Sequence, residues 1–348
     1  MATAGNVQGQ MADATVDVLK HDAVTSVKWV DDFDFLRYPS RTIVNEDGSL
    51  FFEYPYDLHD ILRITSSLGI PWHDISEKGH DFSFSTQYGG FEWDLEHKRI
   101  ALLDKKRKKY MHKIQAVLAN PENRVNLRMV QSLHGTLQHA SFVYRDGRAF
   151  LPALTHFIAS FPNAFALFHL PTRVRNDLIW WQDTLSHEDF SRSLFPRTVI
   201  DLHIYVDAST GWGIGLVVGD RWAAWRLVGE WRSADRDIGW AEFIAVELAA
   251  LWISTQPVRD ANVLVHGDNQ GVIDSLTKGR CRNLSRNEVI RRITTSLIPA
   301  NLTLSTMYIP SAHNPADSCS RGELGPVERR LQVNFELPIE LQPFLLHV

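Results

Sequence analysis

The sequence predicts a mixed α+β and α/β protein whose two halves are built differently, and three observations lead to this fold class. Apolar residues recur at intervals of three and four between residues 101 and 190, which is typical of helices. From residue 199 onward, three strand patterns follow one another and then alternate with helices, which indicates a mixed sheet with helices against it. The composition changes at residues 191–198, where we place a domain boundary.

The composition excludes several classes of protein. At 348 residues the chain is long enough for about two domains, and 44% apolar residues suffice for ordinary packed cores. The net charge of −5 gives no global sign of nucleic-acid binding, so such a role depends on local basic clusters. Only Cys281 and Cys319 are present, and neither a signal peptide nor a long apolar run occurs. We expect an intracellular protein, cytoplasmic or nuclear, without membrane association.

The first half is predicted to be mixed and then mostly helical. Residues 1–100 contain a helical pattern, two strands that flank Asp31 and Asp32, and a hairpin at Gly89-Gly90. These predicted elements are 12–20, 24–30, 33–39 and 84–95. The clearest helices of the following segment are 126–143, 149–161 and 174–185.

The second half is predicted to contain five strands and two helices. Their ranges, in the order strand, strand, strand, helix, strand, helix, strand, are 202–209, 212–219, 221–228, 241–254, 262–268, 269–278 and 302–310. Asp207 lies near the end of the first of these strands, on the face opposite Ile204 and Val206. Asp268 ends the fourth strand. If these two strands are parallel neighbours, their carboxylates lie close together at the carboxyl ends.

Further carboxylates extend this acidic set. Asp317 follows a turn signal just after the last strand, and the helix at 241–254 offers Glu242 or Glu247. The two glutamates flank the apolar stripe of that helix at similar angles, so periodicity alone does not choose between them. Each acid by itself is more often a solvated carboxylate or a helix cap, and an N-cap explains Asp268 equally well. Several carboxylates held together require cations, and oxygen ligands favour magnesium.

Four stretches carry a resemblance to a known family. They are VDASTGWGIG, AEFIAVELAAL, HGDNQGVIDSLTKG and YIPSAHNPADSCSRG, in this order within residues 199–322. In them the chain resembles the ribonuclease H domain of retroelement polyproteins, most like those of DIRS-type and related fungal elements. The resemblance implies catalytic and metal-binding roles for Asp207, Glu242, Asp268 and Asp317. It selects Glu242 over Glu247, because the family glutamate stands at this spacing before the pair Ala245-Val246.

The first half extends this resemblance to a reverse transcriptase. SVKWVDDFDFLRYP is similar to the metal-binding hairpin of the palm, and AGNVQGQMADA is similar to the motif before it. The resemblance implies that Asp31 and Asp32 are a vestigial polymerase metal site. YGGFEWDLEHKRIALLDKKRKKY is similar to the hairpin and thumb entry that grip the primer. The family carries another palm aspartate and the fingers upstream, where this chain has only thirty residues before Asp31. We therefore expect no template copying by this polypeptide alone.

The resemblance implies four segments. They are a truncated reverse-transcriptase palm at 1–100, a helical thumb or connection at 101–190, a ribonuclease H-like domain with a mixed five-stranded sheet and helices at 199–326, and a C-terminal tail at 327–348. The implied function is hydrolysis of the RNA strand of RNA/DNA hybrids with two Mg²⁺ ions, for which Mn²⁺ can substitute. Two alternatives stay open: a catalytically inactive, co-opted nucleic-acid-binding module, and a fragment of a full RNA-directed DNA polymerase whose upstream part is missing from this chain. Whether a partner supplies the missing palm and fingers is not determined by the sequence.

Two basic runs are candidates for holding the phosphate backbone of nucleic acid. The first run is Lys105, Lys106, Arg107, Lys108 and Lys109. The second begins with Lys278, Arg280 and Arg282 and continues with Arg286, Arg291 and Arg292. A solvated helix face explains the first run equally well. The second follows Asp268 closely in the chain, which favours contact with a substrate at the acidic site.

Overall fold

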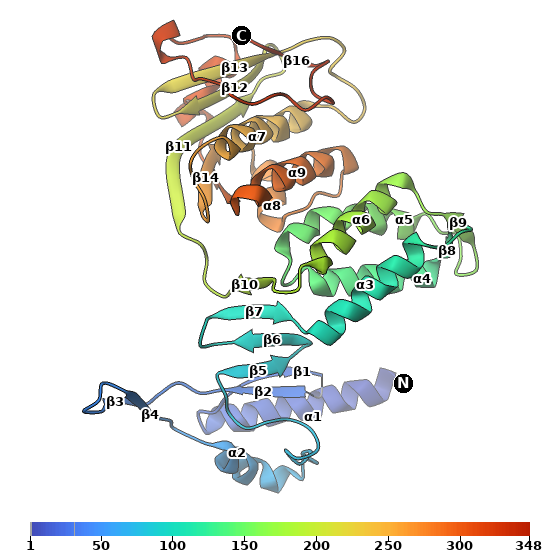
Figure 1. Cartoon of the computed structure of the whole chain (residues 1–348), viewed down its shortest axis with the longest axis vertical. Helices are drawn as coiled ribbons and strands as arrows, with labels where there is room; N and C mark the ends of the chain where they lie inside the picture. Colours follow the sequence, from blue (N-terminus) through green and yellow to red (C-terminus); the bar gives the residue numbers. More distant parts are fainter. Residues whose placement is uncertain (1, 31) are drawn as a thin grey trace. The chain divides into compact units, whose positions relative to one another are not determined.

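The computed structural model describes residues 2–30 and 32–348, and the chain divides into two compact units, Met1–Leu103 and Asp104–Val348. The first unit combines helices with short antiparallel strands (Figure 1). Its elements are α1 (Ala2–His21), β1 (Thr25–Trp29), β2 (Asp32–Leu36), β3 (Arg41–Val44), β4 (Leu50–Glu53), α2 (Leu58–Thr65), η1 (Ser66–Leu68), β5 (Ser85–Tyr88), β6 (Phe91–Asp94) and β7 (Arg99–Leu102).

Both hairpins predicted for the first unit are present. β1 pairs antiparallel with β2 and places Trp29 opposite Asp32. β5, β6 and β7 form an antiparallel meander. The turn between β5 and β6 has positive φ at both Gly89 and Gly90, a backbone conformation that glycine adopts without steric cost.

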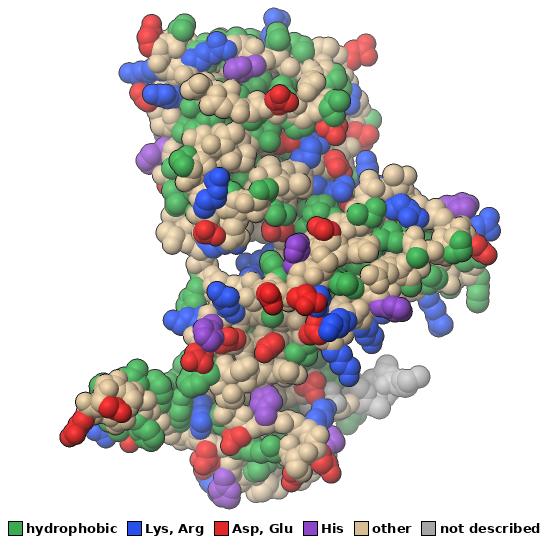
Figure 2. Space-filling model, in the orientation of Figure 1, with side chains coloured by type: hydrophobic (Ala, Val, Ile, Leu, Met, Phe, Trp, Pro, Cys, Tyr) green, Lys and Arg blue, Asp and Glu red, His purple; other side chains and the backbone are tan. Residues whose placement is uncertain are grey.

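The β3–β4 hairpin was not predicted, although Asp47-Gly48 at its turn is a common hairpin signal. It exposes Val44, Leu50 and Phe51, and Figure 2 shows apolar side chains along it. The core of the first unit lies elsewhere, where α1 and α2 pack together and bury Leu19 and Ile61. The hairpin is therefore an extension of the unit rather than part of its core.

The second unit begins with a helical segment, as the periodicity of residues 101–190 predicts. Its elements are α3 (Asp104–Leu118), β8 (Arg124–Asn126), α4 (Leu127–Ala140), η2 (Arg145–Phe150), α5 (Pro152–Ala159), β9 (Leu167–His169), α6 (Thr172–Ser186) and β10 (Ser191–Ser193). Ile114, Leu137 and Trp181 are fully buried in it. Gly147 permits this packing, because a Cβ there would lie 2.2 Å from ring atoms of Trp181.

A mixed sheet follows, with strand order β15-β14-β11-β12-β13-β16. Its strands are β11 (Val199–Ala208), β12 (Gly213–Val218), β13 (Arg221–Leu227), β14 (Asn262–Gly267), β15 (Thr303–Tyr308) and β16 (Leu345–His347). β11, β12 and β13 form an antiparallel meander, whereas β14 and β15 run parallel to β11. The expectation of five strands was one short, because β16 pairs with the edge of β13.

Helices cover both faces of this sheet. They are α7 (Ile238–Ser254), α8 (Gln270–Lys278), α9 (Leu284–Leu297) and α10 (Ala316–Ser320), with short turns at η3 (Ile298–Ala300), η4 (Ser311–His313) and η5 (Val327–Arg329). α10 packs with Tyr205 and Val217 on one face. Val206 faces α7 on the other, as the alternation of strand side chains requires. No helix in the described part of the chain is both long and apolar enough to cross a membrane.

Candidate metal centre

Parallel pairing of β11 and β14 brings two aspartates to the same edge of the sheet. Tyr205 on β11 is in register with His266 on β14. Asp207 and Asp268 each lie two residues further along the chain, so they lie side by side at the carboxyl-terminal end of this strand pair. The parallel neighbours expected from the sequence are therefore observed, and they explain why residues 61 positions apart meet.

Glu242 completes a group of three carboxylates. Ligand oxygens of Asp207, Glu242 and Asp268 all lie within 4.8 Å of one another. Asp207 is 5% exposed and Glu242 is 9% exposed, whereas Asp268 is half-buried. A strand, a helix and the end of a second strand each supply one carboxylate, so the tertiary fold alone brings them together.

Glu242 and Glu247 differ in what their side chains contact, and this difference selects Glu242 as the candidate ligand. Glu247 is 1% exposed, and Arg292 on α9 donates to both of its oxygens at 2.5 and 2.6 Å. It is therefore a buried ion pair that joins two helices. Periodicity failed here because α7 is buried around most of its circumference, between the sheet and α9, and both glutamates lie inside.

The three carboxylates are held at high electrostatic cost. Burial, followed by the charges of Asp207 and Asp268, raises the pKa of Glu242 to about 9. Its neighbours around a small hollow are mostly aliphatic and include Val206, Val246 and Val265. Burial also raises the pKa of Asp207 to about 6, and the charges of Asp268 and Asp317 act in the same direction. Among the described residues, none of the three carboxylates forms an ion pair with a basic side chain.

Packing of α10 against β12 completes the surroundings of Asp207. Asp207 pairs with Gly215 in the antiparallel ladder. A Cβ at Gly215 would lie 2.5 Å from the backbone oxygen of Ala316, so only glycine lets α10 approach this closely. As a result, the hydroxyl of Ser320 on α10 donates a hydrogen bond to Oδ2 of Asp207.

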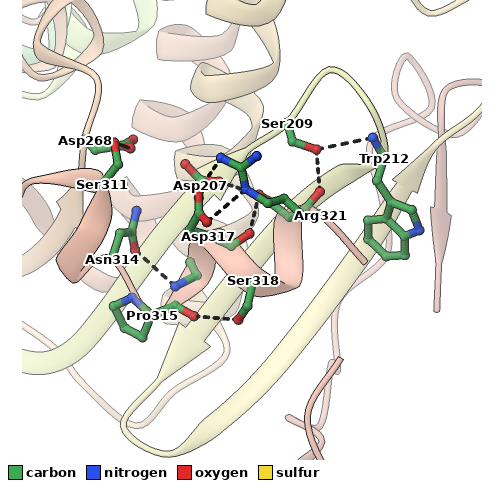
Figure 3. Close-up of polar contacts among 12 residues, drawn as sticks. Asp207, Ser209, Trp212, Asp268, Ser311, Asn314, Pro315, Asp317, Ser318 and Arg321 are labelled. Atoms are coloured by element: carbon green, nitrogen blue, oxygen red, sulfur yellow. Dashed lines mark hydrogen bonds and ion pairs between the residues drawn. The ribbon is translucent and has the colours of Figure 1, made fainter. Parts of the chain in front are cut away.

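The loop before α10 is fixed to the same strand. The side-chain amide of Asn314 is buried and donates to the backbone oxygen of Val206 at 2.9 Å, while its oxygen accepts from the backbone nitrogen of Ala316 at 3.1 Å. From the sequence, the Asn-Pro pair at 314–315 indicates only the turn that precedes Asp317. In the structure Asn314 also anchors the turn beside Asp207 (Figure 3).

Asp317 lies next to the three carboxylates but has a partner of its own. Arg321, one helical turn later, donates to both of its oxygens, at 2.8 Å from Nη2 and 2.9 Å from Nε (Figure 3). The charge of Asp317 nevertheless contributes to the raised pKa of Asp207. The structure thus groups three of the four candidate carboxylates and holds the fourth beside them in an exposed ion pair.

Asp268 does not serve as a helix cap. Asn269 is the N-cap of α8, and its side chain accepts from the backbone nitrogens of Gly271 and Val272. Asp268 instead accepts a hydrogen bond from the hydroxyl of Ser311 in η4. Its carboxylate is therefore directed to the acidic group, and the alternative explanation as an N-cap is removed.

The residues of this group suit a divalent cation. All three candidate ligands are carboxylates, the hard oxygen donors that Mg²⁺ and Mn²⁺ bind. The pKa values of Asp207 and Glu242 are raised because each carboxylate is buried next to other carboxylates. A bound cation would reduce the repulsion between these negative charges. In the part of the chain that the structure describes, Asp207, Glu242 and Asp268 form a group of three possible metal-ligating side chains.

The predicted polymerase pair falls partly outside the structure. Asp31 lies outside the described residues. Asp32 begins β2, has a largely exposed side chain, and lies 3.5 Å from Nζ of Lys78. No third metal-ligating side chain joins Asp32 in the part of the chain that the structure describes.

In the first basic run, the lysines and the arginine have different surroundings. Lys105, Lys108 and Lys109 are exposed and Lys106 is half-buried. Arg107 is 3% exposed, and its guanidinium donates to Asp104, to Glu188 and to the backbone oxygen of Leu185. Arg107 was therefore wrongly included, because it ties α3 to the end of α6 and cannot reach a phosphate.

The second basic run divides into two sets. Lys278, Arg280 and Arg282 are exposed in and after the end of α8. The arginines of α9 form ion pairs inside the protein instead. These pairs are Arg286 with Asp237, Arg291 with Asp177 and Glu288, and Arg292 with Glu247. Spacing along the sequence cannot distinguish the two sets, since the acidic partners lie up to 114 residues away.

Three residues at the site were missed by sequence reasoning: Ser311, Ser320 and Arg321. A partial signal existed for two of them, because Ser320 and Arg321 follow Asp317 by three and four positions, the spacing of one helix face. The position of Ser311 depends on how η4 packs against the end of β14. Nothing in its local sequence distinguishes it from an ordinary turn serine.

Comparisons with known proteins give two structural similarities. No protein-family model and no curated protein matches the chain. The chain is similar to RNase H1 from the halophilic archaeon Halobacterium salinarum NRC-1, with 18% sequence identity and a TM-score of 0.27, over 36% of this chain and 96% of that one. It is also similar to the foamy viral protease-reverse transcriptase dRH in complex with ds DNA, with 15% identity and a TM-score of 0.35, over 85% of this chain and 48% of that one. The chain thus spans about half of the foamy viral protein.

Proposed function

We propose that the protein is a ribonuclease H-type endonuclease that hydrolyses the RNA strand of RNA/DNA hybrids with Mg²⁺, or with Mn²⁺ in its place. The observation that carries the proposal is the convergence of Asp207, Glu242 and Asp268, with ligand oxygens within 4.8 Å of one another. They meet at the carboxyl-terminal edge of two parallel strands in a mixed sheet, as the sequence resemblance to ribonuclease H domains requires.

In this proposal four carboxylates act together as the ligands of two ions. Asp207, Glu242 and Asp268 would hold the ions, and Asp317 beside them would supply a further carboxylate. Ser320 and Ser311 orient the carboxylates of Asp207 and Asp268 by donating hydrogen bonds. To bind an ion, Asp317 would have to give up its ion pair with Arg321.

When bound, the two ions would lower the pKa of the attacking water and stabilise charge on the leaving 3′ oxygen. Asp207 and Glu242 must release any protons they hold before they bind an ion, so metal binding is coupled to pH. The products would carry 5′-phosphate and 3′-hydroxyl ends. Recognition of the RNA strand would depend on its 2′-hydroxyl groups and on the shape of the hybrid.

The test is digestion of a hybrid with labelled RNA by the purified chain in Mg²⁺, beside the variant Asp207→Asn and a sample in EDTA. The expected result is cleavage of the RNA strand only, by the unaltered protein with Mg²⁺ only. If the unaltered protein binds Mg²⁺ and hybrid but leaves the RNA intact, the catalytic proposal fails. The non-catalytic binding module is then the better description.

For the first unit we propose descent from a reverse-transcriptase palm, with a vestigial metal site at Asp31 and Asp32. The β1–β2 hairpin, which places Asp32 at the start of its second strand, supports this proposal. Purified chain given primer, template and nucleotides is expected to incorporate nothing. Incorporation above that of an Asp32→Asn variant would show that the polymerase site is complete.

A further inference from the structure

Four arginines from three segments of the second unit lie together, away from the acidic group. Arg145 and Arg148 belong to η2, Arg192 belongs to β10, and Arg280 follows α8. The α-carbon of Gly279 faces the side chain of Arg148, so that a Cβ there would lie 3.6 Å from Cβ of Arg148. This contact places the start of the loop after α8 directly on η2.

Two further contacts bring Arg280 and Arg192 to the same place. Arg280 donates from Nη1 to Oε1 of Gln138 on α4 at 3.3 Å. The guanidinium of Arg192 lies 5.6 Å from the ring centroid of Phe142. Because residues 138–148 form one continuous stretch from α4 into η2, these contacts gather the four guanidinium groups around it.

No acidic side chain in the described part of the chain forms an ion pair with any of these four arginines. In the described part of the second unit, the arginines that do form ion pairs are different ones: Arg107, Arg286, Arg291, Arg292, Arg321 and Arg329. Asp146, the acid between Arg145 and Arg148 in the chain, interacts electrostatically with Arg197 instead. Burial, together with the charges of Arg145 and Arg280, lowers the pKa of Arg148, and burial with the charges of Arg145 and Arg148 lowers that of Arg192.

The position of this cluster relative to the acidic group is set by one helix. Asp268 precedes α8, and Gly279 and Arg280 follow it. At a rise of about 1.5 Å per residue, this nine-residue helix separates the two ends by about 14 Å. That distance corresponds to about four nucleotides of one strand, at about 3.4 Å each.

We infer that Arg145, Arg148, Arg192 and Arg280 form a second phosphate-binding site, which holds the backbone of a nucleic-acid strand about one helix length from the acidic group. The inference rests on the proposed function for the identity of the ligand, because unpaired guanidinium groups bind phosphates of any nucleic acid. The helical segment then contributes to substrate binding through η2, rather than only through the lysines of α3. A short hybrid that ends before this site would lack its contribution.

The test measures binding of a labelled RNA/DNA hybrid of about 20 base pairs in EDTA, over a range of salt concentrations. The paired variants are R145Q/R280Q, which replaces two exposed arginines, and R148Q/R192Q. The control is R221Q/R226Q, which removes two exposed arginines from β13, on the other side of β11 in the sheet from β14 and β15. Thermal unfolding confirms that each variant is folded.

Each replaced phosphate contact lowers the slope of log K against log salt by about 0.9, so each pair at the site should lower it by about 2. The control should leave the slope unchanged. The inference fails if folded R145Q/R280Q and R148Q/R192Q keep the original slope, if the control lowers it equally, or if the unaltered protein does not bind the hybrid.

This outcome is separable from that of the proposed nuclease function. If the slope falls as expected but the unaltered protein does not cleave hybrid in Mg²⁺, the phosphate site stands and the nuclease does not. If the hybrid is cleaved and the slope is unchanged, the nuclease stands and the phosphate site does not. The control variant should cleave at the original rate in either case.

Discussion

Replacing Glu242 with glutamine should stabilise the protein in the absence of metal, although Glu242 lies in the proposed active site. The pKa of Glu242 is raised from 4.5 to about 9 in the folded protein. Between these values the folded state keeps a proton that the unfolded state has released, so stability falls as pH rises. Glutamine has nearly the same shape and no proton to lose, and therefore escapes this cost.

The size of the effect follows from the width of this pH window. One pKa unit corresponds to about 1.4 kcal/mol, and from pH 4.5 to pH 7 the cost grows to about 3 kcal/mol. Between pH 6.5 and pH 8.5 alone, the stability difference between Glu242→Gln and the unaltered protein should increase by about 2.5 kcal/mol. Asp207, with a pKa of about 6, has lost most of its pH dependence in that range and contributes little to the change.

The assay is urea unfolding in EDTA at several pH values, followed by the same series in Mg²⁺. Mg²⁺ should stabilise the unaltered protein, and more so at high pH, because protons compete with the ion. It should stabilise Glu242→Gln much less. The variant Glu247→Gln is the matched control on the same helix, and it should lose up to about 3 kcal/mol, because the half-buried guanidinium of Arg292 is left without its charged partner.

Two results would refute this reasoning. One is a Glu242→Gln variant that is less stable than the unaltered protein in EDTA at pH 8. The other is a stability difference that does not change with pH. Either would mean that the carboxyl group of Glu242 is ionised and compensated in the folded protein, so that the acidic group does not need a cation.

The remaining predictions concern the surroundings of the site. Gly215→Ala should force α10 away from β12 and strongly reduce both thermal stability and Mg²⁺-dependent stabilisation, while Gly211→Ala, with no atom within 4 Å of the new Cβ, should leave the site's Mg²⁺-dependent stabilisation intact. Arg321→Gln should raise Mg²⁺ affinity several-fold in calorimetry, because the cation that competes for Asp317 is removed, and unchanged or weaker binding would contradict the proposed exchange. Deleting residues 345–348 should lower the melting temperature and promote self-association detectable by light scattering, because the edge of β13 loses its partner strand, and a monomeric variant of unchanged stability would count against this role of β16.

The candidate site was predictable from the sequence where its residues belong to regular elements. Asp207 and Asp268 could be placed together because alternation identifies the strands, and the connection through a helix makes these strands parallel. For Glu242 the residues left two possibilities, and the resemblance to ribonuclease H domains was needed to select one. Asp317 was predicted as part of the acidic set, but its ion pair with Arg321 was not.

Predictions based on charge alone were less successful. Arg107 and its neighbours look alike in the sequence, yet Arg107 is buried and the lysines on either side are not. Whether a basic residue faces water depends on where α6 lies, and α6 is more than sixty residues further along the chain. Acidic partners for the arginines of α9 are equally distant, so a run of positive charge does not by itself define a binding surface.

Sequence patterns alone were enough to predict the central strands of the sheet in the second unit, the helix that carries Glu242, and the carboxyl-end location of Asp207 and Asp268. These features follow from local periodicity and turn residues, which act over a few positions. Other features became visible only in the folded protein: Glu242 faces the aspartates while Glu247 faces Arg292, Ser320 reaches Asp207 across Gly215, and β16 joins the sheet. Each of these depends on atoms from distant segments fitting against one another, because close packing, unlike periodicity, is a property of the whole folded chain.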